Sequence, residues 1–155
     1  DRRAERLLAD AQFGAGSNEA AILTYERVFE HSPAVKDDPV AYNNYLTALQ
    51  RSGALEKLLP LLDAAIRSGP RETAARAQVM RGKARVQADQ LEAAAMDFMR
   101  TADLFRDVTN IQAEAVFHTA TTLERMEDGR ATEYFKRLGD EFGDSPFAAR
   151  AQSKP

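Results

Sequence analysis

The chain is 155 residues long, carries 21 basic and 24 acidic side chains for a formal net charge of −3, and contains no cysteine. This near balance of charge, with no long block of like charges, disfavours nucleic acid as a partner. The absence of cysteine excludes disulfides, thiolate metal sites and thiol nucleophiles, and no apolar run approaches the ~20 residues of a membrane-spanning helix.

Helical spacing of apolar residues runs through the whole sequence, so we expect helices and no sheet. Glycine, proline and capping residues separate the helical stretches. In chain order, the predicted helices span roughly residues 2–13, 17–31, 39–52, 54–68, 71–88, 90–106, 110–127 and 130–142, with a short ninth helix beginning at Pro146. Within the fourth, Pro60 lacks an amide hydrogen and its ring meets the carbonyl of Glu56, so we expect a bend there without a break.

The sequence matches itself when it is shifted by 36 or 37 residues, and the matching positions fall on one helical face. Three such columns read Ala21, Leu58, Ala94 and Ala131; Tyr25, Leu62, Phe98 and Phe135; and Val28, Ala65, Thr101 and Leu138. A period of this length is typical of helical hairpins that stack because none can bury its apolar face alone. We therefore predict a single all-α solenoid domain over residues 1–155. Its four hairpins are expected at approximately residues 2–33, 39–70, 71–107 and 110–143, followed by a C-terminal helix at 146–152.

The second helix of these hairpins carries a recognisable pattern. The stretch Gly53-x-x-Glu56-Lys57-Leu58-x-x-x-Leu62-x-x-Ala65-x-x-x-x-Pro70 resembles a tetratricopeptide repeat (TPR), and the first unit repeats it as Ala21-x-x-x-Tyr25-x-x-Val28-x-x-x-x-Pro33. Four units in phase cover nearly the whole chain. The resemblance implies a right-handed α-solenoid, and because the usual TPR pitch is 34 residues, the extra residues here must lengthen the loops between units or the first helices.

One stretch departs from the usual TPR pattern, and another resembles a more particular kind of repeat. In the third unit Gly82 matches the family, whereas Gln78, Arg81 and Arg85 stand where apolar or aromatic residues are usual, so the register of residues 74–88 stays open by one position. The ending Phe135-x-x-Leu138-x-x-x-Phe142-x-x-Ser145-Pro146-x-Ala148-x-x-Ala151 resembles repeats of bacterial cell-envelope proteins. This second resemblance implies a location in the cell envelope or periplasm, which composition alone leaves undecided.

The sequence offers little for catalysis or metal binding. His31 and His118 lie far apart in different predicted helices, and no nucleophile motif accompanies either of them. The pair Asp37-Asp38 is better explained as a helix cap than as metal ligands, and His31 suits a helix C-terminus. We therefore expect no enzymatic activity, no cofactor and no metal.

The TPR resemblance implies instead a concave groove lined by the first helix of each hairpin. Its positions correspond here to Arg6, Asn43, Asn44, Thr47, Arg51, Arg76, Lys83, Phe117, His118 and Thr121, with Asp10, Arg125 and either Met80 or Val79 beside them. Arg6, Asn44 and Arg76 resemble part of the clamp with which some relatives bind a terminal carboxylate, but Asp10 and Met80 replace two expected members. Another extended or helical peptide is the favoured ligand, with Phe117 supplying apolar contact.

The leading functional hypothesis is thus a protein–protein interaction module, a scaffold or adaptor that binds a peptide or protein segment. Self-association through the terminal units is the alternative, because the ends of a solenoid expose apolar faces. The candidate residues are Leu7, Leu8 and Phe13 at the front and Phe147, Ala148 and Ala151 at the back. A third hypothesis is a regulatory domain of a larger protein, since the chain begins with Asp1 and we expect a processed or excised segment.

Overall fold

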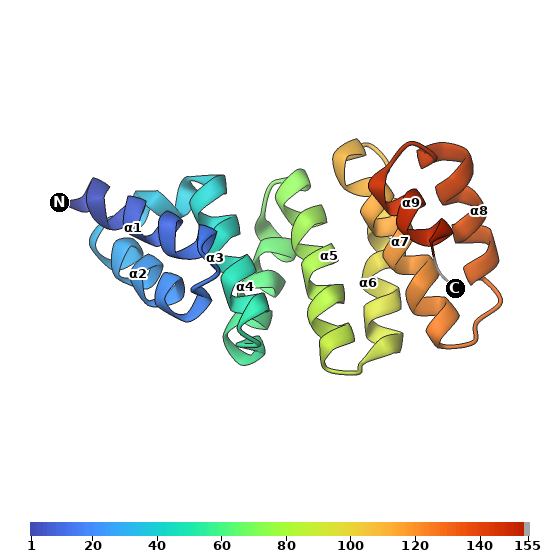
Figure 1. The fold of residues 1–155 in the computed structure, drawn as a ribbon, viewed down its shortest axis with the longest axis horizontal. Helices are drawn as coiled ribbons and strands as arrows, with labels where there is room; N and C mark the ends of the chain where they lie inside the picture. The colour runs from blue at the N-terminus through green and yellow to red at the C-terminus, as the bar shows by residue number, and fades with distance from the viewer. Residues whose placement is uncertain (154–155) are drawn as a thin grey trace. The chain divides into compact units, whose positions relative to one another are not determined.

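The computed structural model describes residues 1–153, and in this range it consists of helices joined by short turns, with no strand (Figure 1). The α-helices are α1 (Arg2–Gly14), α2 (Asn18–His31), α3 (Pro39–Arg51), α4 (Leu55–Ser68), α5 (Arg71–Gln87), α6 (Leu91–Leu104), α7 (Thr109–Arg125), α8 (Ala131–Phe142) and α9 (Pro146–Gln152). The predicted helices agree with these bounds to within about two residues at each end.

A short 3-10 helix, η1 (Pro33–Asp37), was not predicted from the sequence. Pro33 starts it, and Asp38 ends it by capping the next helix, since its carboxylate accepts hydrogen bonds from the Val40 and Ala41 amides. Extra length also appears in α5 and α7, which have 17 residues each, against 13 in α1 and α3. The longer pitch is therefore accommodated both between hairpins and in first helices.

The chain divides into two compact units, and the division falls at Pro60. The first unit comprises Asp1–Pro60 and the second begins at Leu61, so both include part of α4. Since α4 continues as one helix through Pro60, the expectation of no break is confirmed. The expected bend and the expected single domain stay predictions.

An aromatic cluster forms the core of the first unit. The Tyr25 side chain is fully buried, and the ring of Phe29 contacts both Tyr25 and Tyr45, at centroid distances of 5.9 and 5.3 Å. The Tyr25 hydroxyl donates to Asp10 Oδ1 at 2.5 Å, and the Tyr45 hydroxyl donates to Glu26 Oε1 at 3.0 Å. Burial, together with the bond to Asp10, raises the pKa of Tyr25 to about 12. Each buried ring thus keeps its polar atom satisfied.

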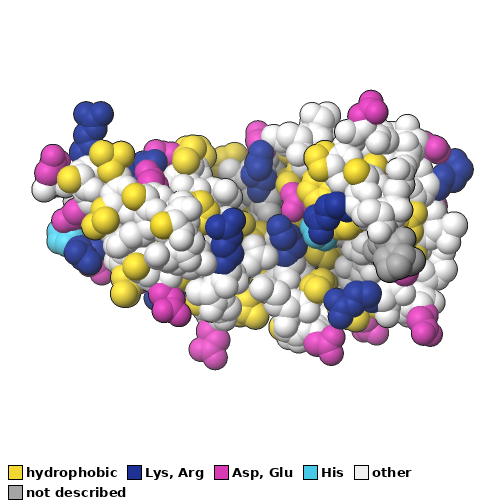
Figure 2. Space-filling view, viewed as in Figure 1, with side chains coloured by type: hydrophobic (Ala, Val, Ile, Leu, Met, Phe, Trp, Pro, Cys, Tyr) yellow, Lys and Arg dark blue, Asp and Glu magenta, His cyan; other side chains and the backbone are white. Residues whose placement is uncertain are grey.

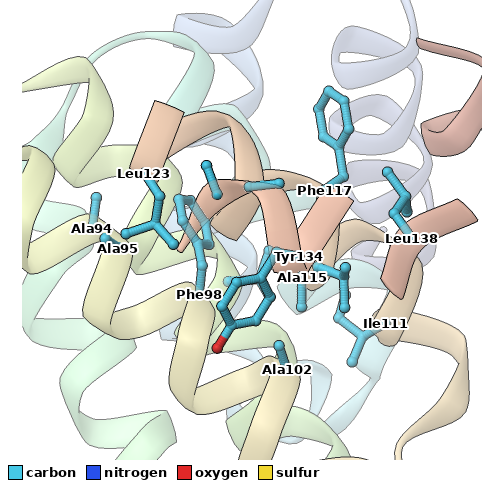
Figure 3. Close-up of a cluster of buried hydrophobic side chains, with 14 of the residues drawn as sticks. Ala94, Ala95, Phe98, Ala102, Ile111, Ala115, Phe117, Leu123, Tyr134 and Leu138 are labelled. Carbon is cyan, nitrogen blue, oxygen red and sulfur yellow. The ribbon is translucent and has the colours of Figure 1, made fainter. Parts of the chain in front are cut away.

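In the second unit the core surrounds Phe98, which has no exposed surface (Figure 3). Leu123 and Leu138 pack in the same cluster. A Cβ atom on Gly82 would lie 2.5 Å from the Phe98 ring, which is closer than any side chain tolerates. Gly82 on α5 therefore lets the ring of Phe98 on α6 approach the α5 backbone, and this contact fixes the register of the two helices.

The polar residues that left residues 74–88 ambiguous face α6, where they surround Asp97. Its carboxylate has no exposed surface and accepts hydrogen bonds from Gln78 Nε2 at 3.2 Å, Arg81 Nη2 at 2.6 Å and Arg85 Nη1 at 2.7 Å. Arg81 also donates through Nη1 to Asp63 on α4 at 2.7 Å. The departure from the TPR pattern is therefore a buried ionic cluster, which sequence reasoning missed because Asp97 adjoins an apolar stripe.

Candidate binding surface

In the first unit, the predicted groove residue Arg6 is engaged within the protein. Its guanidinium donates to Asp10 Oδ2 at 2.8 Å and to Asp38 Oδ2 at 2.7 Å. The bond to Asp38 raises the pKa of Arg6 and, in return, lowers the pKa of Asp38. Arg6 thus joins α1 to the start of α3, a role that explains its conformation without any ligand.

The other predicted residues of the first unit lie on α3. Asn43 is exposed, while Asn44 and Thr47 are half-buried, and the Asn44 side chain hydrogen-bonds with Tyr25. The Arg51 guanidinium lies over the ring of Phe13, 5.0 Å from its centroid. Of this set, Asn43 and Arg51 are exposed, and Arg51 is held against Phe13.

In the second unit, one predicted groove residue lies apart, while the others contact one another through side chains. Arg76 is exposed and pairs with Glu72 on its own helix at 3.2 Å. Lys83 on α5 and His118 on α7 both approach Glu114 Oε1, through Lys83 Nζ at 3.0 Å and His118 Nε2 at 3.6 Å. The contacts with His118 and Lys83 lower the pKa of Glu114 to about 2. Sequence reasoning missed Glu114, although its position four residues before His118 on one helical face could have indicated it.

Aromatic rings continue this group towards α9. The His118 ring stacks on Phe98 at 5.0 Å between centroids, and Phe147 lies 6.2 Å from His118. The Thr121 hydroxyl donates to the His118 carbonyl at 3.3 Å. His118 is therefore held on two sides, and its side chain keeps 19% exposure.

Phe117 corrects an expectation, because it was expected to offer apolar contact in the groove. It is only 6% exposed and belongs to the core. The Phe147 ring lies 5.5 Å from it, and the Arg150 guanidinium lies 4.6 Å from its centroid. The physical reason is α9, which packs on α7 and covers this residue.

Three successive first helices thus contribute to one row of side chains, which we call the α5/α7/α9 surface: Lys83, Glu114, His118, Thr121, Phe147 and Arg150. Lys83 and His118 both approach the Glu114 carboxylate there, and Arg150 lies over the rings of Phe117 and Phe147. On the face in view, Figure 2 shows basic side chains gathered around a histidine in the second unit. The surface combines charged donors with aromatic carbon, which suits recognition of an acidic group beside an apolar one.

Two pockets lie apart from this surface. One, of about 330 Å³, lies in the second unit and is lined by Glu124, Phe135, Leu138, Gly139, Ala148, Ala151 and Gln152. The other lies in the first unit, where the turn and first residues of α2, Gly16 to Ala20, face Arg51 and Ser52. Over residues 1–153, no group of three or more His, Asp or Glu side chains is arranged to hold a metal ion. In the same range no helix has the length and apolarity to cross a bilayer.

Hairpins of this kind, α1 with α2, α5 with α6 and α7 with α8, define a TPR-like α-solenoid. Two solved structures share the fold. MamA from Desulfovibrio magneticus RS-1, residues 41 to the end, superimposes with a TM-score of 0.73 and 19% sequence identity, over 94% of this chain and 78% of that one. A MamA RS-1 ArsTM double mutant gives a TM-score of 0.71 and 19% identity, over 100% and 79%. The likeness confirms the expected all-α fold of helical hairpins.

In comparisons of sequence, no protein-family model and no curated protein matches the chain.

Proposed function

We propose that this protein is a non-catalytic protein–protein interaction module that binds an acidic peptide segment along the α5/α7/α9 surface. The observation that carries this function is the continuity of the row, in which Lys83, His118 and Arg150 come from three successive first helices and are linked through Glu114 and Phe147. A TPR-like fold supports a role in binding, because repeats of this kind present extended surfaces to partners.

The charges of the row favour an acidic ligand. Glu114 keeps its negative charge over the ordinary pH range, because the pKa of its carboxyl is lowered to about 2. It holds Lys83 and His118 in place, yet the Lys83 side chain remains 39% exposed, and Arg150 is exposed as well. Both cations are therefore accessible to carboxylates on a partner, and charge-assisted bonds of this kind are the stronger class of hydrogen bond.

The aromatic part of the row favours an apolar side chain next to the acidic one. Phe147 is half-buried, with one side against Phe117, and Arg150 lies 5.6 Å from its centroid. An aromatic ring held in this way loses little conformational freedom on binding, which is typical of residues that dominate interface energies. Separately, in the first unit, we propose that the exposed Asn43 on α3 hydrogen-bonds to a peptide backbone.

A peptide array of acidic and aromatic sequences, followed by fluorescence anisotropy in solution, tests this function. Lys83→Ala and Arg150→Ala are expected to weaken binding of the selected peptides by about 10-fold each, and added salt is expected to weaken it further. Lys136→Ala is the matched control, because Lys136 is an exposed cation on α8 that pairs with Asp140, outside the α5/α7/α9 surface. Equal affinity in all three variants, with unchanged melting temperatures, would exclude this surface as the binding site.

A further inference from the structure

The outer face of α6 carries charged and apolar side chains that its packing does not use. Helix α6 packs on α5 and α7 through its buried side chains, while Glu92, Met96 and Arg100 are exposed. These three residues follow one another at intervals of four, so they form a single ridge along the helix surface. We call Glu92, Met96 and Arg100 the α6 ridge.

The two charges of the α6 ridge have no partner within the chain. Over residues 1–153, no hydrogen bond or ion pair engages the side chain of Glu92 or of Arg100. Exposed charges on α8 differ in this respect, since Lys136 pairs with Asp140 on the same helix at 2.7 Å. Glu92 and Arg100 are therefore available to a partner.

The apolar member of the ridge lies midway between the two charges. Met96 is 53% exposed, with an acidic residue one turn before it and a basic residue one turn after it. A single exposed methionine is ordinary on a protein surface, so exposure alone identifies no partner. The order of the charges on its two sides is more informative.

This order makes the α6 ridge complementary to itself. When two such ridges meet antiparallel with Met96 at the centre, Glu92 of each copy lies opposite Arg100 of the other, and the two methionines meet. A parallel arrangement would instead set each charge opposite its own kind, which is unfavourable. The charges therefore favour one direction of pairing, in which a two-fold axis at Met96 relates the two copies.

We propose that the α6 ridge docks antiparallel on the α6 ridge of a second copy of this chain. Such a contact uses the same patch on both copies, so it closes at a dimer and does not extend further. The inference goes beyond the proposed peptide binding and does not rest on it, because no residue of the α6 ridge belongs to the α5/α7/α9 surface.

Helix α2 carries a similar order of side chains, and it supplies a comparison. Glu19, Leu23 and Arg27 are exposed there at the same spacing. Glu19, however, lines a pocket together with Arg51, so a cation of its own unit competes with any outside partner. We therefore assign the contact to α6, and a charge variant of α2 tests that choice.

Sedimentation velocity over a range of protein concentrations tests the pairing. The native sequence is expected to pass from monomer to dimer and no further, and added salt should weaken the dimer. Glu92→Arg and Arg100→Glu should each weaken association by about 10-fold or more, because either reversal sets like charges opposite each other twice. Glu133→Arg is the matched control, since Glu133 is an exposed acid in the first turn of α8, as Glu92 is in α6.

A monomer at every concentration, or an equal loss in the control, would overturn the proposal. Loss of the dimer in Glu19→Arg but not in Glu92→Arg would place the contact on α2 and overturn the assignment to α6.

Combining the two reversals sharpens the test. An equimolar mixture of Glu92→Arg and Arg100→Glu should recover the dimer, because every reversed side chain then lies opposite a charge of the other sign. The double variant Glu92→Arg/Arg100→Glu should likewise dimerise by itself, as the native sequence does. A mixture or a double variant that stays monomeric would contradict the antiparallel contact between α6 ridges.

Discussion

The first and third hairpins join their two helices through the same pair of positions but with different side-chain chemistry. Positions 12 and 24 in the first hairpin correspond to positions 85 and 97 in the third, since the two are 73 residues apart. In the first, the Thr24 hydroxyl donates to Gln12 Oε1 at 2.7 Å, and in the third, Arg85 donates to the buried carboxylate of Asp97 at 2.7 Å. The hairpin geometry thus accepts a neutral hydrogen bond or an ion pair at one place.

The two contacts need different numbers of hydrogen-bond partners around them. A neutral pair needs only one partner for each group, as Thr24 and Gln12 provide. A buried carboxylate needs enough donors to replace water, and Asp97 obtains them from Gln78, Arg81 and Arg85 together. The polar sequence of α5 therefore follows from Asp97, the buried one of the three acidic residues on α6.

The largest expected effect comes from removing that carboxylate. Asp97→Ala is expected to lower the free energy of unfolding by about 3–5 kcal/mol, because Arg85 then loses its partner carboxylate and Arg81 keeps only its bond to Asp63. Urea denaturation measures the loss. Asp107→Ala is the control, since Asp107 forms an exposed pair with Arg71 and its loss should change the free energy of unfolding very little. Similar losses in the two variants would mean that Asp97 is not the centre of the α5–α6 contact.

The next-largest effect concerns Gly82, where the α5 backbone lies against the Phe98 ring, beside the Asp97 cluster. Gly82→Ala is expected to cost about 1–3 kcal/mol, because its Cβ would overlap the Phe98 ring. Gly139→Ala, where a Cβ has open space, is expected to stabilise the chain by about 0.5–1 kcal/mol through helix propensity. Thermal unfolding of both variants gives the signs of the two changes. A gain in stability for Gly82→Ala would contradict the close approach of α5 and α6.

A smaller loss is expected in the first hairpin. Thr24→Val keeps the shape of the side chain and removes the hydroxyl that bonds Gln12, so about 0.5–1.5 kcal/mol should be lost. Thr132→Val, at an exposed position on α8, is the control and should change the free energy of unfolding very little. A loss at Thr24 as large as that at Asp97 would remove the distinction between neutral and ionic hairpins.

A further effect is a pH dependence of the contact between α5 and α7. The pKa of Glu114 is lowered in the folded chain from 4.5 to about 2, so its ionised form contributes stability above pH 4.5, and this contribution is lost as the pH falls towards 2. The difference in melting temperature between the native sequence and Glu114→Gln should therefore shrink across this interval. A constant difference would show that Lys83 and His118 do not hold the Glu114 carboxylate.

Much of the fold was predictable because its signals are local. Helix ends follow capping residues, glycines and prolines, as Asp38 before α3 and Ser145 before α9 illustrate. The repeat period predicted the helical hairpins, because the period depends on the spacing of residues such as Tyr25 and Phe98 rather than on their contacts.

The candidate site was less predictable because its contacts join residues far apart in the sequence. Lys83 and Glu114 are 31 positions apart, and no local pattern brings them together. Phe117 occupies a groove position in the TPR pattern, yet whether it meets solvent depends on α9, a helix outside that pattern. Arg6 likewise has its partner Asp38 at the start of another helix.

The short helix α9 has a practical consequence for anyone who trims the chain. Its Phe147 and Arg150 shield Phe117 from solvent, and its Ala148 is 2% exposed. A version cut before Ser145 would uncover this aromatic surface while retaining helices α1 to α8. Such a shortened protein should bind hydrophobic dyes and precipitate more readily than the longer one.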